Sequence, residues 1–157
     1  MSKLILGTSG FGRLAKGYEI NVNDIKTKTF TVAASETAGI EGGDCLVATA
    51  TPQVYALPSA TSNTVVGICL ATNVKTDTVF PQSVGEVKFM PGEHGGCVIS
   101  GEVAVKLYGT APTEGAAVYY DLTNKAFTAT ATSNLACPNM RFSGITEGSL
   151  TVVRVLY

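Results

Sequence analysis

The stretch that decides the fold covers residues 95–121 and has the sequence GGCVISGEVAVKLYGTAPTEGAAVYYD. In its first half the side chains alternate with a period of two, which is typical of a β-strand with unlike faces. One face is expected to carry Val98, Ser100, Glu102, Ala104, Lys106 and Tyr108, and the other Ile99, Val103, Val105 and Leu107. Residues 109–115 carry Gly, Pro and Thr, which favour a turn. A second strand is predicted to begin at residue 118.

The chain after residue 26 repeats this pattern of short strands and turns. Strands are predicted at residues 27–34, 45–50, 53–58, 64–73, 77–80, 84–90, 121–132, 140–146 and 149–157. Turns or loops are predicted at 35–44, 59–63, 91–96 and 133–139, and hairpin tips at 124–125 and 147–148. Gly67 lies inside a predicted central strand and indicates a bulge or a close backbone approach. Short helical turns stay open at 11–16, 59–63 and 133–139.

Strands of this length, with turn signals about every 8–12 residues, predict an all-β fold. We expect a compact β-barrel or sandwich of short antiparallel strands. It would form a single β domain over residues 27–157, in line with the total length of 157 residues.

Residues 1–26 differ from this domain. Four glycines interrupt them, and their apolar side chains are too scattered to form the face of a helix or strand. Such a segment is too apolar for a solvated tail, which predicts an extended N-terminal arm that binds a partner. The residues expected to make this contact are Leu4, Ile5, Leu6, Phe11, Arg13, Leu14 and Tyr18. The alternative is an arm folded back onto its own subunit.

Composition excludes several classes of partner. The net charge is −1 and the basic residues are dispersed, which argues against nucleic-acid binding. No apolar run approaches the ~20 residues that cross a bilayer, and the apolar patch near the N-terminus is shorter than that of a signal peptide. We therefore expect a protein assembled in the cytoplasm. Only 15% of residues are charged, which indicates a surface partly covered by further copies or by a partner.

No motif predicts catalysis, a cofactor or a metal site. The single histidine, His94, stands beside Glu93 in PGEHGG, where a surface turn residue is the simpler interpretation of it. The stretch GTSGFGR at 7–13 has neither phosphate-loop nor dinucleotide-binding spacing, and the carboxylates show no paired spacing. The four cysteines form no CxxC pair and are expected to be small buried hydrophobic residues. Of Tyr119 and Tyr120, one is expected in the core and the other at an interface.

Several landmarks resemble phage capsid decoration or cement proteins of the DUF2190-like structural family. They are Ala38-Gly39, Gly43-Asp44, Val66-Gly67-Ile68-Cys69-Leu70, Ser100-Gly101-Glu102-Val103, Gly115, Val118-Tyr119-Tyr120-Asp121, Gly144-Ile145 and Val152-Val153-Arg154-Val155-Leu156. The resemblance covers roughly residues 36–157, and the order and spacing of the landmarks carry it. It implies a β-barrel-like body, often trimeric, bound to the major capsid protein on the outside of a phage head. It implies no catalytic residue.

The sequence thus predicts a non-enzymatic virion protein that cements a capsid. One alternative is a β binding module at the base of a head fibre or in a tail, which attaches another protein or touches host glycans. A small hydrolase that uses His94 with a nearby carboxylate is a second alternative. A cytoplasmic β protein unrelated to phage is a third.

Overall fold

The computed structural model describes residues 8–9, 13–14, 16–20, 25–71 and 88–156. Every regular element among them is a β-strand, so this part of the chain holds no helix that could cross a membrane. The strands are β1 (Thr8–Ser9), β2 (Arg13–Leu14), β3 (Lys26–Val32), β4 (Ile40–Glu41), β5 (Cys45–Ala48), β6 (Val54–Ala56), β7 (Val65–Cys69), β8 (Lys88–Phe89), β9 (His94–Lys106), β10 (Ala117–Asp121), β11 (Ala126–Thr128), β12 (Leu135–Glu147) and β13 (Leu150–Val155). The predicted strand at 77–80 and most of that at 84–90 lie outside the described residues.

The first half of the molecule is a closed barrel of five strands. Its order is β9-β3-β6-β5-β7, and β7 pairs again with β9 to close the ring. The β3–β6 pair is parallel and the other pairs are antiparallel. The interior holds Phe30 stacked on Tyr55, with ring centroids 5.6 Å apart, together with Leu46, Cys69 and Cys97. The predicted all-β barrel is confirmed, with one parallel pair in it.

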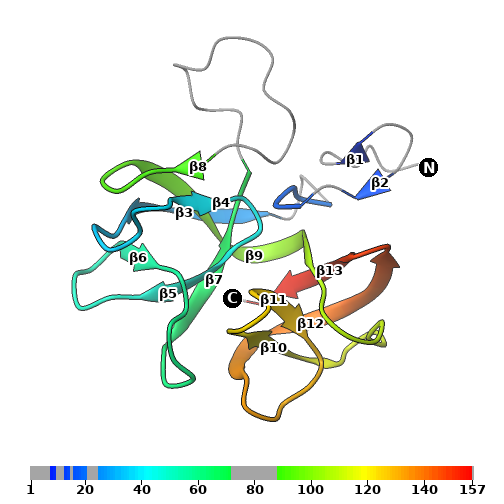
Figure 1. Ribbon diagram of the computed structural model, residues 1–157. Helices are drawn as coiled ribbons and strands as arrows, with labels where there is room; N and C mark the ends of the chain where they lie inside the picture. Colours follow the sequence, from blue (N-terminus) through cyan, green and yellow to red (C-terminus); the bar gives the residue numbers. More distant parts are fainter. Residues whose placement is uncertain (1–7, 10–12, 15, 21–24, 72–87, 157) are drawn as a thin grey trace.

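The second half is a curved antiparallel sheet with the order β11-β10-β12-β13-β9. The last strand of this order, β11, lies beside the chain just after β9. There Leu107 pairs with Phe127, and the Tyr108 N–H donates to the Phe127 carbonyl at 2.9 Å. Both halves share β9, which crosses the middle of the molecule in Figure 1. This long strand therefore joins the barrel to the second sheet.

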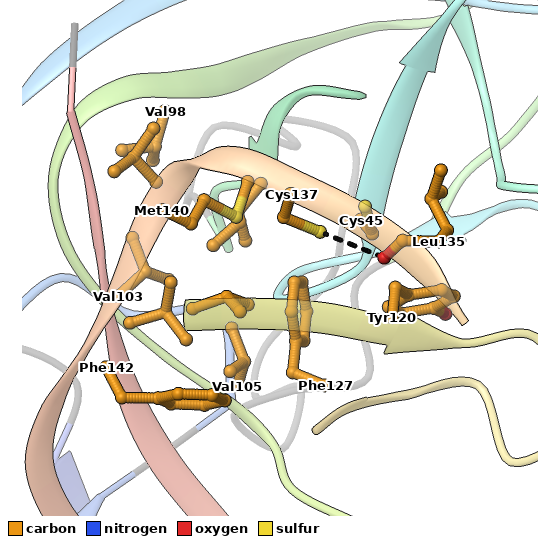
Figure 2. Close-up of a cluster of buried hydrophobic side chains, with 14 of the residues drawn as sticks. Cys45, Val98, Val103, Val105, Tyr120, Phe127, Leu135, Cys137, Met140 and Phe142 are labelled. Atoms are coloured by element: carbon orange, nitrogen blue, oxygen red, sulfur yellow. Dashed lines mark hydrogen bonds between the residues drawn. The ribbon is translucent and has the colours of Figure 1, made fainter. Parts of the chain in front are cut away.

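One large core fills the space between the two halves. The barrel contributes Cys45, Val47, Ile68 and Val98 from the outer side of β5, β7 and β9. The second sheet contributes the remaining members: Val103, Val105, Leu107, Val118, Tyr120, Phe127, Leu135, Cys137, Met140, Phe142, Val153 and Val155. Figure 2 shows Cys45 and Val98 of the barrel together with side chains of the second sheet such as Cys137 and Met140. Burial of so much apolar surface is the main force that holds the halves together.

The predicted alternation along β9 is wrong in one respect. Val98 and Val103 were expected on opposite faces, yet both lie in the shared core. Two features between these residues interrupt the alternation of side-chain direction. The pairing with β3 skips Ile99, because Lys26 lies opposite Ser100 and Thr27 opposite Val98. Gly101 then adopts φ +134°, which favours glycine.

Two further local predictions are wrong. Residues 133–139 were expected to be a loop, but β12 begins at Leu135, which is buried together with Cys137. Pro138 is tolerated because the register with β10 jumps from Cys137 to Arg141, so no ladder bond is required of it. The expected turn at 91–96 ends early, because β9 begins at His94.

Other predictions from glycine and cysteine positions are confirmed. The register of β5 with β7 shifts at Gly67, where a Cβ atom would lie 2.7 Å from the Cys97 sulfur and collide with the Val98 carbonyl. A turn that includes residues 124–125 joins β10 to β11, as predicted, and the turn between β12 and β13 falls at 148–149, one residue later than predicted, because Glu147 still pairs with Leu150. All four cysteines are free and buried. Burial raises the pKa of the Cys97 thiol to about 12, which keeps it protonated and unreactive.

Candidate functional site

Residues 16–20, called here the N-terminal segment, lie along one edge of β9. The Gly17 N–H donates to the Ala104 carbonyl at 2.7 Å, the Ala104 N–H to the Tyr18 carbonyl at 3.0 Å, and the Ile20 N–H to the Glu102 carbonyl at 2.9 Å. The opposite edge of the same part of β9 pairs with β13. The segment therefore completes the second sheet and covers an edge that would otherwise be open to another strand.

A small apolar cluster holds the same segment against the outer face of the second sheet. Ile20 is buried there with Ala104 and Val152, and Leu150 packs against them. This cluster is separate from the two larger cores. It fixes the N-terminal segment by side-chain packing as well as by backbone hydrogen bonds.

The segment also touches the barrel through glycine backbones. Gly17 has φ +83°, and a Cβ atom on it would lie 2.6 Å from the Cα atom of Gly42. The Ala71 N–H donates to the Gly17 carbonyl at 2.8 Å. Only a residue without a side chain allows this close crossing. Gly17 thus ties the N-terminal segment to the barrel and to the second sheet at one point.

Ion pairs surround this crossing. The Lys16 ammonium lies 2.8 Å from the Asp44 carboxylate and 3.5 Å from that of Glu41, which also lies 3.3 Å from Lys88. Desolvation by burial lowers the pKa of Lys16, but attraction and hydrogen bonding to Asp44 and Glu41 outweigh it, so the net pKa is raised. The stabilisation is therefore fully present below the unfolded pKa of 10.5 and is lost as pH rises through the higher folded value.

Replacing Lys16 with methionine should loosen the N-terminal segment, because the stem is kept and both ion pairs are lost. We expect the free energy of unfolding to fall by about 1 kcal/mol at neutral pH, with the difference from wild type vanishing at strongly alkaline pH. Lys88→Met is the matched control. Lys88 is more exposed and, among the described residues, pairs with Glu41, so its loss should cost less than about 0.5 kcal/mol. Equal losses in urea unfolding of the two variants would contradict this role of Lys16.

The structure does not gather the predicted arm residues into one site. Leu4, Ile5, Leu6 and Phe11 lie outside the described residues. Arg13 and Leu14 form β2, which pairs with β1, and this hairpin stands apart from the barrel and the second sheet in Figure 1. Tyr18 is half-buried in the N-terminal segment, where burial and the neighbouring Glu19 raise its pKa. The domain boundary at residue 26 stays a prediction.

Sequence reasoning missed the residues that hold the N-terminal segment in place, namely Lys16, Gly17 and Ile20. Glycine usually indicates a turn, and nothing near Gly17 signals a contact with Gly42 or Ala71. The one available hint was Gly42-Gly43 followed by Asp44, an acidic residue beside two small ones. It does not indicate which basic residue pairs with it.

A groove of about 390 Å³, called here the charged groove, opens beside β12 and β13. Glu102, Glu114, Arg141 and Arg154 line it, and the Arg154 guanidinium lies 2.7 Å from the Glu102 carboxylate. Ile145 and Leu156, two of the large apolar side chains with substantial exposure, stand at its wall. Mixed charges beside exposed apolar groups are typical of a protein contact surface.

The residues considered for hydrolysis are engaged in local contacts. The His94 ring nitrogen Nδ1 lies 3.0 Å from the Thr31 hydroxyl at the start of β9. The Glu93 carboxylate accepts the Met90 N–H at 2.5 Å within its own turn. Among the described residues, no group of His, Cys, Asp and Glu side chains is arranged to hold a metal ion.

Comparison with known proteins identifies the family. A family model described as "Structural cement protein (E217 gp24/Pam3 gp6)" matches residues 8–156. The chain belongs to the phage structural cement proteins. The resemblance noted in the sequence is thereby confirmed, and the cement protein is a non-enzymatic component of the virion capsid.

The solved structures that resemble this cement protein include a chain from "The capsid of Myoviridae Phage XM1". The two chains share 18% sequence identity and superpose with a TM-score of 0.65, covering 99% of this chain and 98% of the other. At this identity the match shows a common fold. A search of curated proteins finds no significant match.

Proposed function

We propose that the cement protein binds the outer surface of a phage head through an N-terminal arm that contacts the major capsid protein or a neighbouring copy. The proposed arm spans residues 1–26. Its contacts Leu4, Ile5, Leu6, Phe11, Arg13 and Leu14 precede Lys16, and Tyr18 lies in the anchored segment at the base of the arm. The observation that carries the proposal is the anchorage of residues 16–20 to both halves of the body. Anchorage at its base lets an arm pass load directly into both halves of the body.

The physical role of such an arm is to join subunits that the capsid protein alone holds weakly. Internal pressure pulls neighbouring capsid subunits apart, and added contacts across their boundary oppose it. Each contact can be weak, because an arm and a body that bind together gain from a high effective concentration. The charged groove, with Ile145 and Leu156, supplies a second contact surface on the body.

We further propose that the protein acts as a homo-oligomer, with a trimer favoured. Support comes from the low content of charged residues, 15%, and from the exposed apolar side chains at the charged groove. Sedimentation equilibrium of the purified protein measures the number of subunits. A single monomeric species at micromolar concentration would contradict this part of the proposal.

Deleting residues 2–14 tests the arm. This truncation keeps Lys16, Gly17 and Ile20, so the covered edge of β9 and the body should remain intact. We expect an unchanged circular dichroism spectrum and melting temperature. We expect binding to empty expanded heads, measured by co-sedimentation, to fall at least about tenfold, since the apolar contacts of the arm are lost.

The matched control replaces an exposed apolar residue in the turn between β8 and β9, Met90→Ser, which should bind heads normally. Full occupancy by the truncated protein would refute the arm. Copy number in virions separates the cement role from the fibre-base or tail alternative. Many copies over the head surface agree with cementing, whereas a few copies at one vertex would contradict it.

A further inference from the structure

A second hollow of about 420 Å³, called here the hydroxyl hollow, lies on the second sheet away from the charged groove. Residues between 108 and 134 line it, and none of the N-terminal segment does. Threonine, serine and asparagine side chains dominate this lining. Its size falls within the range of about 300–1,000 Å³ that is usual for small-ligand sites.

An aromatic ring stands at this hollow. Tyr108 is 51% exposed, the most of any large hydrophobic side chain in the described residues. Its backbone is nevertheless fixed, because its N–H donates to the Phe127 carbonyl at 2.9 Å. A half-exposed aromatic residue on a backbone that is held in place offers a flat apolar surface at little cost in conformational entropy.

The lining offers few charged groups to a ligand. Asp121 is the one charged residue that lines it. Its carboxylate accepts the Thr123 N–H at 2.8 Å, and the backbone N–H and side-chain amide of Asn124 at 2.9 and 2.8 Å. These bonds, led by those from Asn124, lower the pKa of Asp121. The carboxylate therefore shapes the wall. No basic residue is among the described lining residues, and the nearby Lys106 ammonium donates to the Asn124 carbonyl at 3.4 Å.

Several polar groups remain available to a ligand. The hydroxyls of Thr132 and Ser133 are exposed and make no hydrogen bond within the described part of the chain. Asn134 donates its amide N–H to the Thr130 carbonyl at 2.9 Å, which leaves its amide oxygen as an acceptor. The hollow thus offers hydroxyls that both donate and accept, together with amide acceptors.

We propose that the hydroxyl hollow binds one or two rings of a neutral saccharide. The C–H face of a pyranose ring would lie on Tyr108, and its hydroxyls would bond to Thr132, Ser133 and Asn134. This activity is separate from capsid binding, because the hollow shares no residue with the arm or its anchor. A cement protein held on a head would then also present a saccharide site to the surroundings of the virion.

Titration of the isolated, isotope-labelled protein tests this proposal without any capsid. The probes are maltotriose, cellotriose and N,N′,N″-triacetylchitotriose, each to about 20 mM, since a single shallow site is expected to bind in the millimolar range. We expect amide shifts confined to the surroundings of Tyr108 and residues 121–134 for at least one probe. Tyr108→Ala should weaken that binding about tenfold, and Tyr108→Phe should preserve it.

Ile145→Ala is the matched control, because Ile145 is 48% exposed but lines the charged groove. It should leave saccharide binding unchanged. The proposal is overturned if no neutral probe shifts these amides, or if Tyr108→Ala binds as tightly as wild type. Preferential binding of dextran sulfate, an anionic probe, would also overturn it. None of these results would change the outcome of the head-binding assay. Saccharide binding by the hydroxyl hollow and head binding by the arm can therefore be refuted independently.

Discussion

Replacing Gly67 with alanine is expected to lower the free energy of unfolding by about 3 kcal/mol or more. Gly67 lies in β7 where this strand passes β9 to close the barrel. A Cβ atom there would collide with the Val98 carbonyl and lie 2.7 Å from the Cys97 sulfur. Val98 is a backbone neighbour inside a paired strand, so it cannot move aside as the end of a flexible side chain can. The barrel has to open at the β7–β9 contact to admit the methyl group.

Gly96→Ala is the matched control for this prediction. Gly96 is also a strand glycine without positive φ, but within the described part of the chain its Cβ would meet only the Leu70 and Thr27 Cβ atoms, at 3.8 and 3.9 Å. These are ordinary contacts, so the variant should be neutral or more stable by about 0.5 kcal/mol, because alanine reduces the entropy of the unfolded chain. Urea unfolding followed by tyrosine fluorescence measures both. Equal stability of the two variants would mean that the barrel does not depend on the backbone approach at Gly67.

The fold class could be predicted from local pattern because short apolar or alternating runs are separated by turn residues. The run CLVA of β5 and the run VVGIC of β7 stand out by composition, and their turns carry glycine or asparagine. The long strand β9 was harder to interpret. Alternation predicts side-chain direction only while the register is regular, and a skipped residue at Ile99 followed by Gly101 reverses it. Such a bulge depends on a partner strand about seventy residues away, which no local window contains.

Cys137 and Pro138 also show that local sequence alone does not decide whether a residue lies in a strand. Cys137 lies in the predicted loop at 133–139, next to Pro138, and proline is rare inside paired strands. The structure instead gives Cys137 a place in the shared core, with its sulfur 3.8 Å from the Leu135 carbonyl. Pro138 falls at the one point where β12 changes its register with β10. Tertiary pairing therefore decides where a proline is harmless.

The candidate site was predictable only in outline. An apolar N-terminal stretch broken by glycines indicates a segment outside the main fold, and family membership agrees with an adhesive role. The anchorage of residues 16–20 follows from contacts with Glu102, Ala104 and Asp44, which are distant in sequence. Composition cannot distinguish a glycine that bends a chain from one that lets two backbones touch.

Gly17→Ala should release the N-terminal segment while the body stays folded. The new Cβ atom would lie 2.6 Å from the Gly42 Cα atom and from the Gly43 nitrogen, in a backbone with φ +83°. The strain of that conformation costs about 1 kcal/mol, and the overlap adds roughly 1–3 kcal/mol. Because the segment is held by a few hydrogen bonds and one small apolar cluster, local release is the cheaper response. Hydrogen exchange at the Ala104 amide, whose acceptor is Tyr18, should accelerate about a hundredfold.

The variant Gly92→Ala distinguishes the effect of atomic overlap at Gly17 from the effect of backbone strain. Gly92 has the same φ of +83°, but no heavy atom of the described residues lies within 4 Å of its would-be Cβ. This variant should lose about 1 kcal/mol of stability through backbone strain alone and should leave exchange at Ala104 unchanged. Head binding should fall in Gly17→Ala and persist in Gly92→Ala, because only the first loosens the base of the arm. Full head binding by Gly17→Ala, with Ala104 exposed to exchange, would show that cementing does not need a fixed arm base.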